Sequence, residues 1–330
     1  MILTIICPTY NEEKYIQKTI ESFLKQQYHS FELEVLICDG MSTDRTREIV
    51  QSFSKQNPLI RLVDNPNRKT PFAFNIGIKE AKGDYVAILG AHSEYDDNYL
   101  QTCFEKLAEK NVVGCSGRII TKAASNNTQA KWSEWVNLSS FGVSGNSFRV
   151  IKEGYVHTIG YPVFKKQALL DVGGYNETLV RNQDNDMNQR LIDAGNRLYC
   201  TWATQCYYRP PVNMNALLKY AEKNGLWNAN SFFVNRKSMR LYHFVPFFFT
   251  LSLLLLTAIG SIEKIILHSN YCWYLLSIII VLHLLAGMLS TIKSMLKEFD
   301  GRKIALPFLF FAFHFSYGWG TIKGFRNRLS

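Results

Sequence analysis

Signatures of several common ligand-binding classes are missing from this sequence of 330 residues. No Gly-x-Gly-x-x-Gly follows the first apolar run and no Gly-x-x-x-x-Gly-Lys-Ser/Thr occurs, which weighs against dinucleotide-binding and P-loop folds. No DNA- or RNA-binding motif occurs, and most aromatic residues lie in apolar runs, so we expect no nucleic-acid partner. The N-terminus has no basic segment before its apolar residues, so we expect no signal peptide.

The sequence also lacks closely spaced cysteine pairs, since no Cys-x-x-Cys occurs, and the number of cysteines, seven, is odd. Several of them, such as Cys7 and Cys38, lie in apolar runs typical of buried strands. This pattern disfavours a disulfide framework or a zinc ribbon. We expect reduced, buried cysteines in a cytosolic domain.

Acidic residues are scarce near the C-terminus. Residues 236–330 hold 11 of the 37 Lys and Arg but only 3 of the 27 Asp and Glu, so they carry +8 of the net charge of +10. The same segment is rich in long apolar runs. Basic charge beside apolar runs favours a membrane surface with anionic lipid over nucleic acid.

The first hundred residues alternate between short apolar runs and helical patterns. Four runs predict strands at Leu3–Cys7, Leu33–Cys38, Ile60–Val63 and Tyr85–Leu89. Alternation of this kind predicts an α/β domain with a parallel sheet, in which ligands bind beyond the carboxyl ends of the strands. Polar loops at 8–12, 39–44 and 90–97 follow three of these strands, so we expect a ligand site there.

The next part of the chain is less regular. We expect a helix at Tyr99–Glu109, a strand at Val112–Ile120, a loop-like aromatic segment around 132–148 and a strand at His157–Phe164. Asp184, Met187 and Leu191 are spaced as on one helix face, which places Asp184 at a helix start on the inward side. A first-turn acid that only stabilises the helix is the simpler interpretation of Asp184.

Several short fragments occur in a fixed order along the first hundred residues. They are Pro8-Thr9-Tyr10-Asn11-Glu12, Asp39-Gly40-x-Ser42-x-Asp44-x-Thr46, Asn75-x-Gly77, Gly83-Asp84 and Ala91-His92-x-x-Tyr95. In this order they resemble the nucleotide-binding half of family 2 glycosyltransferases with the GT-A fold, and residues 65–75 and 91–95 resemble the succinoglycan type of exopolysaccharide glycosyltransferase. The resemblance implies a GT-A nucleotide-diphospho-sugar transferase fold, a Rossmann-like mixed sheet with helices on both faces.

The resemblance also implies a donor site for a nucleotide-diphosphate sugar, with UDP as the usual nucleotide. Thr9 and Glu12 match positions that contact the nucleoside, and Asp39 matches the carboxylate that pairs with the base edge. Arg68 and Lys69 could reach the diphosphate, although exposed basic residues are common in loops. The predicted donor-binding residues are Pro8, Thr9, Tyr10, Glu12, Asp39, Gly40, Ser42, Arg68, Lys69, Ala91 and His92.

The chain departs from the family where relatives carry Asp-x-Asp, because the matching triplet here is Gly90-Ala91-His92. His92 could ligate Mn²⁺ with help from Glu94 or Asp96, since imidazole suits Mn²⁺ better than Mg²⁺. Alternatively, His92 donates a hydrogen bond to the diphosphate, or is structural. The cofactor prediction is therefore Mn²⁺ or Mg²⁺, with His92 and Glu94 as candidate ligands.

On the acceptor side, Gln183-Asp184 resembles the family's Glu-Asp pair, in which the aspartate is the general base. That role suits an inverting displacement, in which the base takes the proton of the attacking hydroxyl. Lys223 and Trp227 match a basic and aromatic segment that holds diphosphate or sugar. Trp227 could equally anchor the protein to a membrane surface.

The apolar runs of the tail predict membrane helices. Residues 244–262 and 271–292 are each long enough to span a bilayer, and basic residues flank the outer ends of both runs. We predict a GT-A domain at 1–235, with a nucleotide half at 1–97 and an acceptor half at 98–235, and a membrane region at 236–330. Residues 304–322 are predicted to be re-entrant or interfacial, with a third span as the alternative.

Together these features predict a multi-pass membrane protein with a cytosolic catalytic domain that moves a sugar from a nucleotide donor to a lipid-linked saccharide. Exopolysaccharide, capsule or O-antigen synthesis is the expected setting. A polyprenyl-phosphate sugar synthase is the alternative within enzymes, and an inactive membrane scaffold or nucleotide-sugar sensor is the alternative from another class. The sequence does not indicate an oligomeric state.

Overall fold

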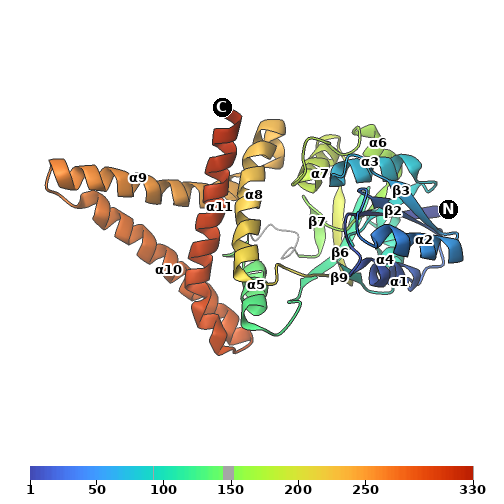
Figure 1. Ribbon diagram of the computed structural model, residues 1–330, viewed down its shortest axis with the longest axis horizontal. Helices are drawn as coiled ribbons and strands as arrows, with labels where there is room; N and C mark the ends of the chain where they lie inside the picture. The colour runs from blue at the N-terminus through green and yellow to red at the C-terminus, as the bar shows by residue number, and fades with distance from the viewer. Residues whose placement is uncertain (92, 144–151, 330) are drawn as a thin grey trace. The chain divides into compact units, whose positions relative to one another are not determined.

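The computed structural model of the protein describes residues 1–91, 93–143 and 152–329 (Figure 1). The chain divides into two compact units, 1–120 with 151–208 and 121–150 with 209–330. The helix at 214–234, which the sequence analysis assigned to the acceptor half, packs within the second unit. The domain bounds predicted from the sequence stay a prediction.

The first unit is built on a mixed sheet with the strand order β3-β2-β1-β4-β8-β6-β9-β5, and β7 pairs with β9. Strands β1 to β4 run parallel, while β8 is antiparallel to both β4 and β6. The strands are β1 Ile2–Thr9, β2 Glu32–Asp39, β3 Ile60–Asp64, β4 Tyr85–Ile88, β5 Glu94–Tyr95, β6 Gly114–Thr121, β7 Gly154–Val156, β8 Val163–Lys165 and β9 Leu198–Tyr208. The predicted mixed α/β fold is confirmed.

Helices cover both faces of this sheet. In Figure 1, α3, α6 and α7 lie along one face, and α1 and α4 lie along the other. The helices are α1 Ile16–Leu24, α2 Thr46–Gln56, α3 Thr70–Glu80, α4 Tyr99–Glu109, α6 Lys166–Asp171 and α7 Gln183–Asp193. Each amphipathic helix turns its apolar side to the sheet, as Ile16, Ile20 and Phe23 of α1 show by being fully buried.

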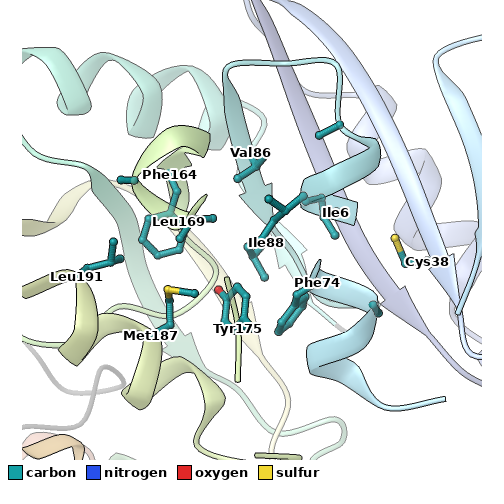
Figure 2. Close-up of a cluster of buried hydrophobic side chains, with 14 of the residues drawn as sticks. Ile6, Cys38, Phe74, Val86, Ile88, Phe164, Leu169, Tyr175, Met187 and Leu191 are labelled. Atoms are coloured by element: carbon teal, nitrogen blue, oxygen red, sulfur yellow. The ribbon is translucent and has the colours of Figure 1, made fainter. Parts of the chain in front are cut away.

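One buried cluster joins α3 and α7 to the central strands (Figure 2). Ile6 of β1 and Ile88 of β4 lie in the same cluster as Phe74 of α3 and Met187 of α7. The ring of Tyr175 lies 4.7 Å from the ring of Phe74, centroid to centroid. The start of α7 is therefore held against the sheet by packing that involves residues far apart in sequence.

Two predicted elements differ from the structure. The segment around 132–148 was expected to be loop-like, but α5 spans Thr128–Leu138 and is capped by Asn127, whose side chain accepts a hydrogen bond from the Ala130 amide at 2.8 Å. The glycine of this region that the structure describes, Gly142, lies after the helix and so does not interrupt it. Residues 144–151 lie outside the described residues.

The prediction of a strand at His157–Phe164 is also wrong for most of that range. Only β8, Val163–Lys165, pairs with the sheet there. Tyr161 has a φ of 54°, a left-handed conformation that a continuous strand excludes. The preceding residues bond to α7 instead, because Asn188 donates to the Thr158 hydroxyl at 3.1 Å and to the Ile159 carbonyl at 3.2 Å.

The second unit is helical. Its helices are α5, α8 Met214–Val234, α9 Val245–Ile266, α10 Tyr271–Lys297 and α11 Leu306–Leu329, with short 3₁₀ turns at Arg236–Ser238, Leu241–Phe244 and Gly301–Ala305. Among the described residues, two helical stretches are long and apolar enough to cross a membrane, Leu241–Ile266 and Tyr271–Lys297. Exposed side chains such as Leu255, Ile259 and Leu282 form apolar surface that lipid would cover.

The hairpin of α9 and α10 is closed by one carboxylate. Glu263 near the end of α9 accepts hydrogen bonds from the amides of Tyr271 and Cys272, at 2.8 and 2.9 Å, and from the Ser269 hydroxyl. These amides belong to the first turn of α10, whose N–H groups have no partner within the helix. Glu263 therefore fixes the turn and supplies hydrogen-bond acceptors to the first amides of α10, the second candidate membrane helix.

Helix α11 packs closely against α8 through glycines. A Cβ added at Gly225 of α8 would collide with the carbonyl oxygen of Tyr317, and one added at Gly320 of α11 would collide with that of Glu222. The two backbones can approach this closely because glycine has no side chain at these two positions. Whether α11 lies in the membrane interface or forms a third span stays a prediction.

We expect Gly225→Ala to destabilise the second unit. The added methyl group meets the Tyr317 backbone, so α8 and α11 must separate, at a cost of about 1 to 3 kcal/mol typical of overpacking. Thermal unfolding of the full-length protein in detergent measures the effect. Gly301→Ala is the matched control, since no described atom lies within 4 Å of a Cβ at that position. Equal stability of both variants would contradict the close packing.

Candidate functional site

The carboxyl ends of β1 and β2 lie side by side. Thr9 is in register with Asp39, and the Gly40 amide donates to the Thr9 carbonyl at 2.8 Å. A Cβ at Gly40 would lie 3.3 Å from the Thr9 oxygen, the Tyr10 ring and the Arg68 Cα. Gly40 therefore lets the segments that carry four predicted donor-binding residues, Thr9, Tyr10, Gly40 and Arg68, approach one another.

Hydrogen bonds join the loops that follow these two strands. The Asn11 amide donates to the Ser42 hydroxyl at 2.8 Å, and the Thr43 amide donates to the Asn11 side chain at 2.9 Å. The Glu12 amide donates to the Thr46 hydroxyl at 2.7 Å. Predicted residues from two separate loops, Glu12 and Ser42, are thereby held in one rigid structure.

Asp39 is fully buried, and its carboxylate is surrounded by donors. One oxygen accepts from the Ser42 hydroxyl at 2.5 Å and, weakly, from the Thr9 hydroxyl at 3.5 Å. The other accepts from the Ser42 amide at 2.9 Å and from Arg47 at 2.8 Å. A carboxylate offers about four acceptor positions, so a ligand N–H would replace the weakest of these bonds, the one from Thr9.

Arg47, which the sequence analysis did not select, bridges the ends of two strands. Its guanidinium lies 2.8 Å from the carboxylate of Asp39 and 2.8 Å from that of Asp64 at the end of β3. These two hydrogen bonds, with Asp39 the larger influence, raise the pKa of Arg47. No sequence spacing identifies this pair, because it depends on β2 and β3 ending next to each other.

Arg68 and Lys69 are exposed and lie directly before α3. Arg68 has a φ of 60°, and its amide donates to the Asn65 carbonyl at 3.0 Å. The Asn65 side chain donates to the Lys69 carbonyl at 3.0 Å. The backbone of this turn is thus ordered by Asn65, which leaves both basic side chains at the surface.

The loop after β4 is held from both sides. The Thr19 hydroxyl donates to the Ala91 carbonyl at 2.6 Å, and the Gly90 amide donates to the Tyr95 hydroxyl at 2.9 Å. Glu94 is exposed on β5, opposite Tyr207 of β9. His92, a predicted donor-binding residue and metal ligand, lies outside the described residues.

The predicted metal site is not assembled by the described residues. Among them, no three His, Cys, Asp or Glu side chains form a group that could hold a metal ion. Gly90 and Ala91 contribute no ligand side chain, and Glu94 lies on an exposed strand. His92, the main predicted ligand, lies outside the described residues, so the metal requirement stays a prediction and we assign no chemical step to it.

Gln183 and Asp184 form the first turn of α7, as predicted. Burial, and then the nearby Asp184 carboxylate, raise the pKa of Tyr175 well above its usual value. The side-chain amide oxygen of Gln183, Oε1, is buried and accepts no hydrogen bond from the residues that the structure describes. A buried acceptor of this kind is costly unless a ligand or water supplies a donor.

The turn before α7 is tied to α3 by Asn75. Its side chain accepts from the Tyr175 amide at 2.7 Å and donates to the Tyr175 carbonyl at 2.8 Å. Gly174 has a φ of 71°, and a Cβ there would lie 2.8 Å from the Asn75 oxygen. The loop carrying Arg68 and Lys69 and the turn leading to Asp184 are therefore connected through one helix.

Lys223 and Trp227 lie on α8, in the second unit. Lys223 is exposed and Trp227 is half-buried. The other predicted site residues belong to the first unit. Sequence reasoning did not select Arg47, and it named Asn75 only within a family motif without its link to Tyr175, because these contacts join segments that are separate in the chain.

Comparisons with known proteins agree with this architecture. The model of the family described as "Glycosyl transferase family 2" matches residues 4–165. This part of the chain belongs to that family. The predicted family, and the enzyme class of glycosyltransferase, are confirmed.

Two curated relatives match most of this chain. A Methanococcus voltae protein named dolichyl N-acetyl-alpha-D-glucosaminyl phosphate 3-beta-D-2,3-diacetamido-2,3-dideoxy-beta-D-glucuronosyltransferase is 29% identical over 98% of this chain and 96% of its own. The succinoglycan biosynthesis protein ExoA of Rhizobium meliloti is 28% identical over 73% of each chain. The predicted likeness to the succinoglycan type is thereby confirmed.

Among solved structures, the chain is similar to a mannosyltransferase from Pyrobaculum calidifontis, PcManGT, determined with GDP-Man and Mn²⁺. The TM-score is 0.57 at 17% identity, and the match covers 96% of this chain and 87% of that one. Identity this low shows the fold alone.

We expect Arg47→Ala to destabilise the first unit by up to about 3 kcal/mol, the lower end of the cost of breaking a buried ion pair, because Ser42 still donates to Asp39. Thermal unfolding of the full-length protein in detergent measures the loss. Arg45→Ala is the matched control, because Arg45 and Glu48 form an exposed pair worth little. If both variants unfolded at the same temperature, the bridge would not be stabilising.

Proposed function

We propose that this glycosyltransferase moves a sugar from a UDP-sugar onto a hydroxyl of a lipid-linked saccharide, with inversion at the anomeric carbon. The Asp184 carboxylate takes the proton of the acceptor hydroxyl. The freed oxygen attacks the anomeric carbon, whose bond to the diphosphate oxygen breaks, and UDP leaves with the bonding electrons. Each residue role below is part of this proposal.

The observation that carries the proposal is the first turn of α7. Asp184 follows Gln183, whose buried side-chain oxygen has no hydrogen-bond partner among the described residues, and Met187 and Tyr175 pack this helix on the strands that lead to the donor loops. The acceptor hydroxyl is assigned to this turn, within reach of Asp184. Such positioning is what general base catalysis needs.

The donor nucleotide is assigned to the ends of β1 and β2. We propose that the base donates an N–H to Asp39 in place of the weak bond from Thr9, and that Tyr10 and Gly40 line the nucleoside site. The exposed Arg68 and Lys69 would attract the diphosphate. His92 retains its sequence-based assignment beside the diphosphate, and Mn²⁺ or Mg²⁺ stays a prediction. Lys223 and Trp227 would contact the acceptor or the diphosphate.

The lipid-linked acceptor is supported by the second unit and by the relatives. The two candidate membrane helices form a hairpin, so both of its outer ends lie on one side of a membrane that it crosses. Basic residues gather at those ends, at Arg236, Lys237 and Arg240 before α9 and Lys293 and Lys297 at the end of α10. This bias favours a cytosolic location for both ends, where a nucleotide donor is available. The Methanococcus relative is named for a dolichyl phosphate-linked sugar and the Rhizobium relative for succinoglycan synthesis.

We expect Asp184→Asn to lower the transfer rate by about 10²- to 10⁴-fold, because the amide cannot take the acceptor proton. Incorporation of radiolabelled sugar into the lipid fraction of membranes measures the rate. Asp193→Asn is the control, since Asp193 lies at the other end of the same helix and accepts a hydrogen bond from Gln189. Full activity of Asp184→Asn would exclude this residue as the base.

We expect more label to reach the lipid fraction from UDP-sugars than from GDP-sugars, because Asp39 matches the position that pairs with uracil. dTDP-sugars complete the panel, since thymine offers Asp39 the same N–H and differs from uracil by a methyl group. The panel is run with membranes, with EDTA and then with Mn²⁺ or Mg²⁺, which also measures the predicted metal requirement. Separate arms supply polyprenyl phosphate and free soluble sugars. Label on polyprenyl phosphate itself would favour the alternative synthase, and equal label on free sugars would contradict a lipid-linked acceptor.

A further inference from the structure

An indole ring is exposed in the middle of β9. Trp202 is 46% exposed, whereas Cys200, Thr201 and Thr204 of the same strand are buried. The guanidinium of Arg118, an exposed residue of the neighbouring strand β6, lies 4.5 Å from the centre of the Trp202 ring. A cation at this distance over an aromatic face is attracted to the ring and holds it in place.

The backbone beneath the ring is also held. The Glu153 carboxylate accepts from the Thr201 hydroxyl at 3.2 Å and from the Trp202 amide at 3.4 Å, and the Thr201 hydroxyl accepts from the Ala203 amide at 3.2 Å. An ordered ring loses little conformational entropy when a ligand stacks on it. The exposed face of the Trp202 ring is therefore ordered and available to a ligand.

The surroundings of Trp202 indicate the kind of ligand. Among the described residues of β6 and β9, Trp202 is the only large hydrophobic residue that is exposed, and its exposed neighbours are Arg118 and Ala203. One ring beside a charged donor is too small a surface for a protein interface or a membrane, which need extended apolar area. It does suit one face of a sugar ring, which packs its C–H groups on an aromatic face while its hydroxyls bond to polar neighbours.

The topology places this pair at the edge of the candidate site. Strand β8 is antiparallel to both β4 and β6, so β6 runs in the direction of β4, and Arg118 lies in the second half of β6. Sheet order separates β4 from β9 by three strand spacings, about 14 Å at roughly 4.8 Å each. More than one sugar ring is needed to cover that span.

We propose that Trp202 and Arg118 form a stacking subsite for the saccharide part of the acceptor, beyond the ring that carries the attacking hydroxyl. The inference rests on the proposed function and adds to it a preference for acceptors longer than one sugar. Trp202 and Arg118 bind the acceptor and take no part in bond making or breaking.

The test measures acceptor and donor saturation separately in the full-length protein. The acceptor probe is the lipid fraction extracted from membranes of the source cells. We expect Trp202→Ala to raise the half-saturating amount of this extract about tenfold, as for loss of an anchoring aromatic, and Arg118→Ala to raise it by less. Half-saturation by the donor and the thermal unfolding temperature stay unchanged, and Trp202→Phe restores most of the affinity.

Tyr155→Ala is the matched control. Tyr155 is likewise an exposed ring under a guanidinium, that of Arg197 at 4.9 Å, but it lies on β7, opposite the N-terminal part of β9. Unchanged acceptor saturation in Trp202→Ala would overturn the inference. So would an equal loss in Tyr155→Ala, or a parallel rise in half-saturation by the donor.

A second measurement does not depend on transfer. Protein labelled with 5-fluorotryptophan is titrated with the glycans released from the same lipid extract by mild acid, and the Trp202 fluorine signal is assigned from Trp202→Phe. We expect this signal to shift with glycans of several sugars and not with monosaccharides. A wild type that transfers no sugar refutes the proposed function, whereas a Trp202 signal that does not move refutes the subsite.

Discussion

The first unit depends on the buried carboxylate of Asp39 at the end of β2. An isolated charge in that position would be costly, so the surrounding chain is arranged to satisfy it. Arg47 supplies the opposite charge and Ser42 supplies two hydrogen-bond donors. These contacts hold the loop after β2 and the start of α2 against the Asp39 carboxylate. The loops after β1 and β2 and the end of β3 converge on this one group, which is why the predicted donor residues of the first two loops, such as Thr9 and Ser42, lie together.

The acceptor side depends on packing. Met187, Tyr175, Phe74 and Ile88 belong to one buried cluster, so the start of α7 is positioned by the same side chains that fix α3 and β4 (Figure 2). Asn75 adds a directional link, because both of its amide hydrogen bonds to Tyr175 require a defined geometry. A rigid scaffold of this kind would suit the proposed displacement, in which Asp184 must meet the hydroxyl at the right angle.

The second unit solves a different problem, since much of its apolar surface faces outward. Helices α9 and α10 expose residues such as Leu255 and Leu282, while several of their polar side chains bond within the unit. Glu263 satisfies the start of α10, and the rings of His283 and His314 join α10 to α11 at 3.0 Å. Hydrogen bonds of this kind, made within the unit beneath an apolar exterior, suit a lipid environment.

The sequence by itself determined the strands that alternate with helices, the helix start at Asp184, the two apolar runs and the family. The strands, the helix start and the apolar runs follow from local periodicity, which is readable along the chain, whereas the family follows from the resemblance of short motifs. The tertiary structure decided the helix at Thr128–Leu138, the left-handed turn at Tyr161 that ends the expected strand, the partner of Asp39 and the exposure of Trp202. Each of these depends on which strands and helices become neighbours. Which elements become neighbours depends on burial and strand pairing between residues far apart in sequence, and a local sequence pattern does not contain that information.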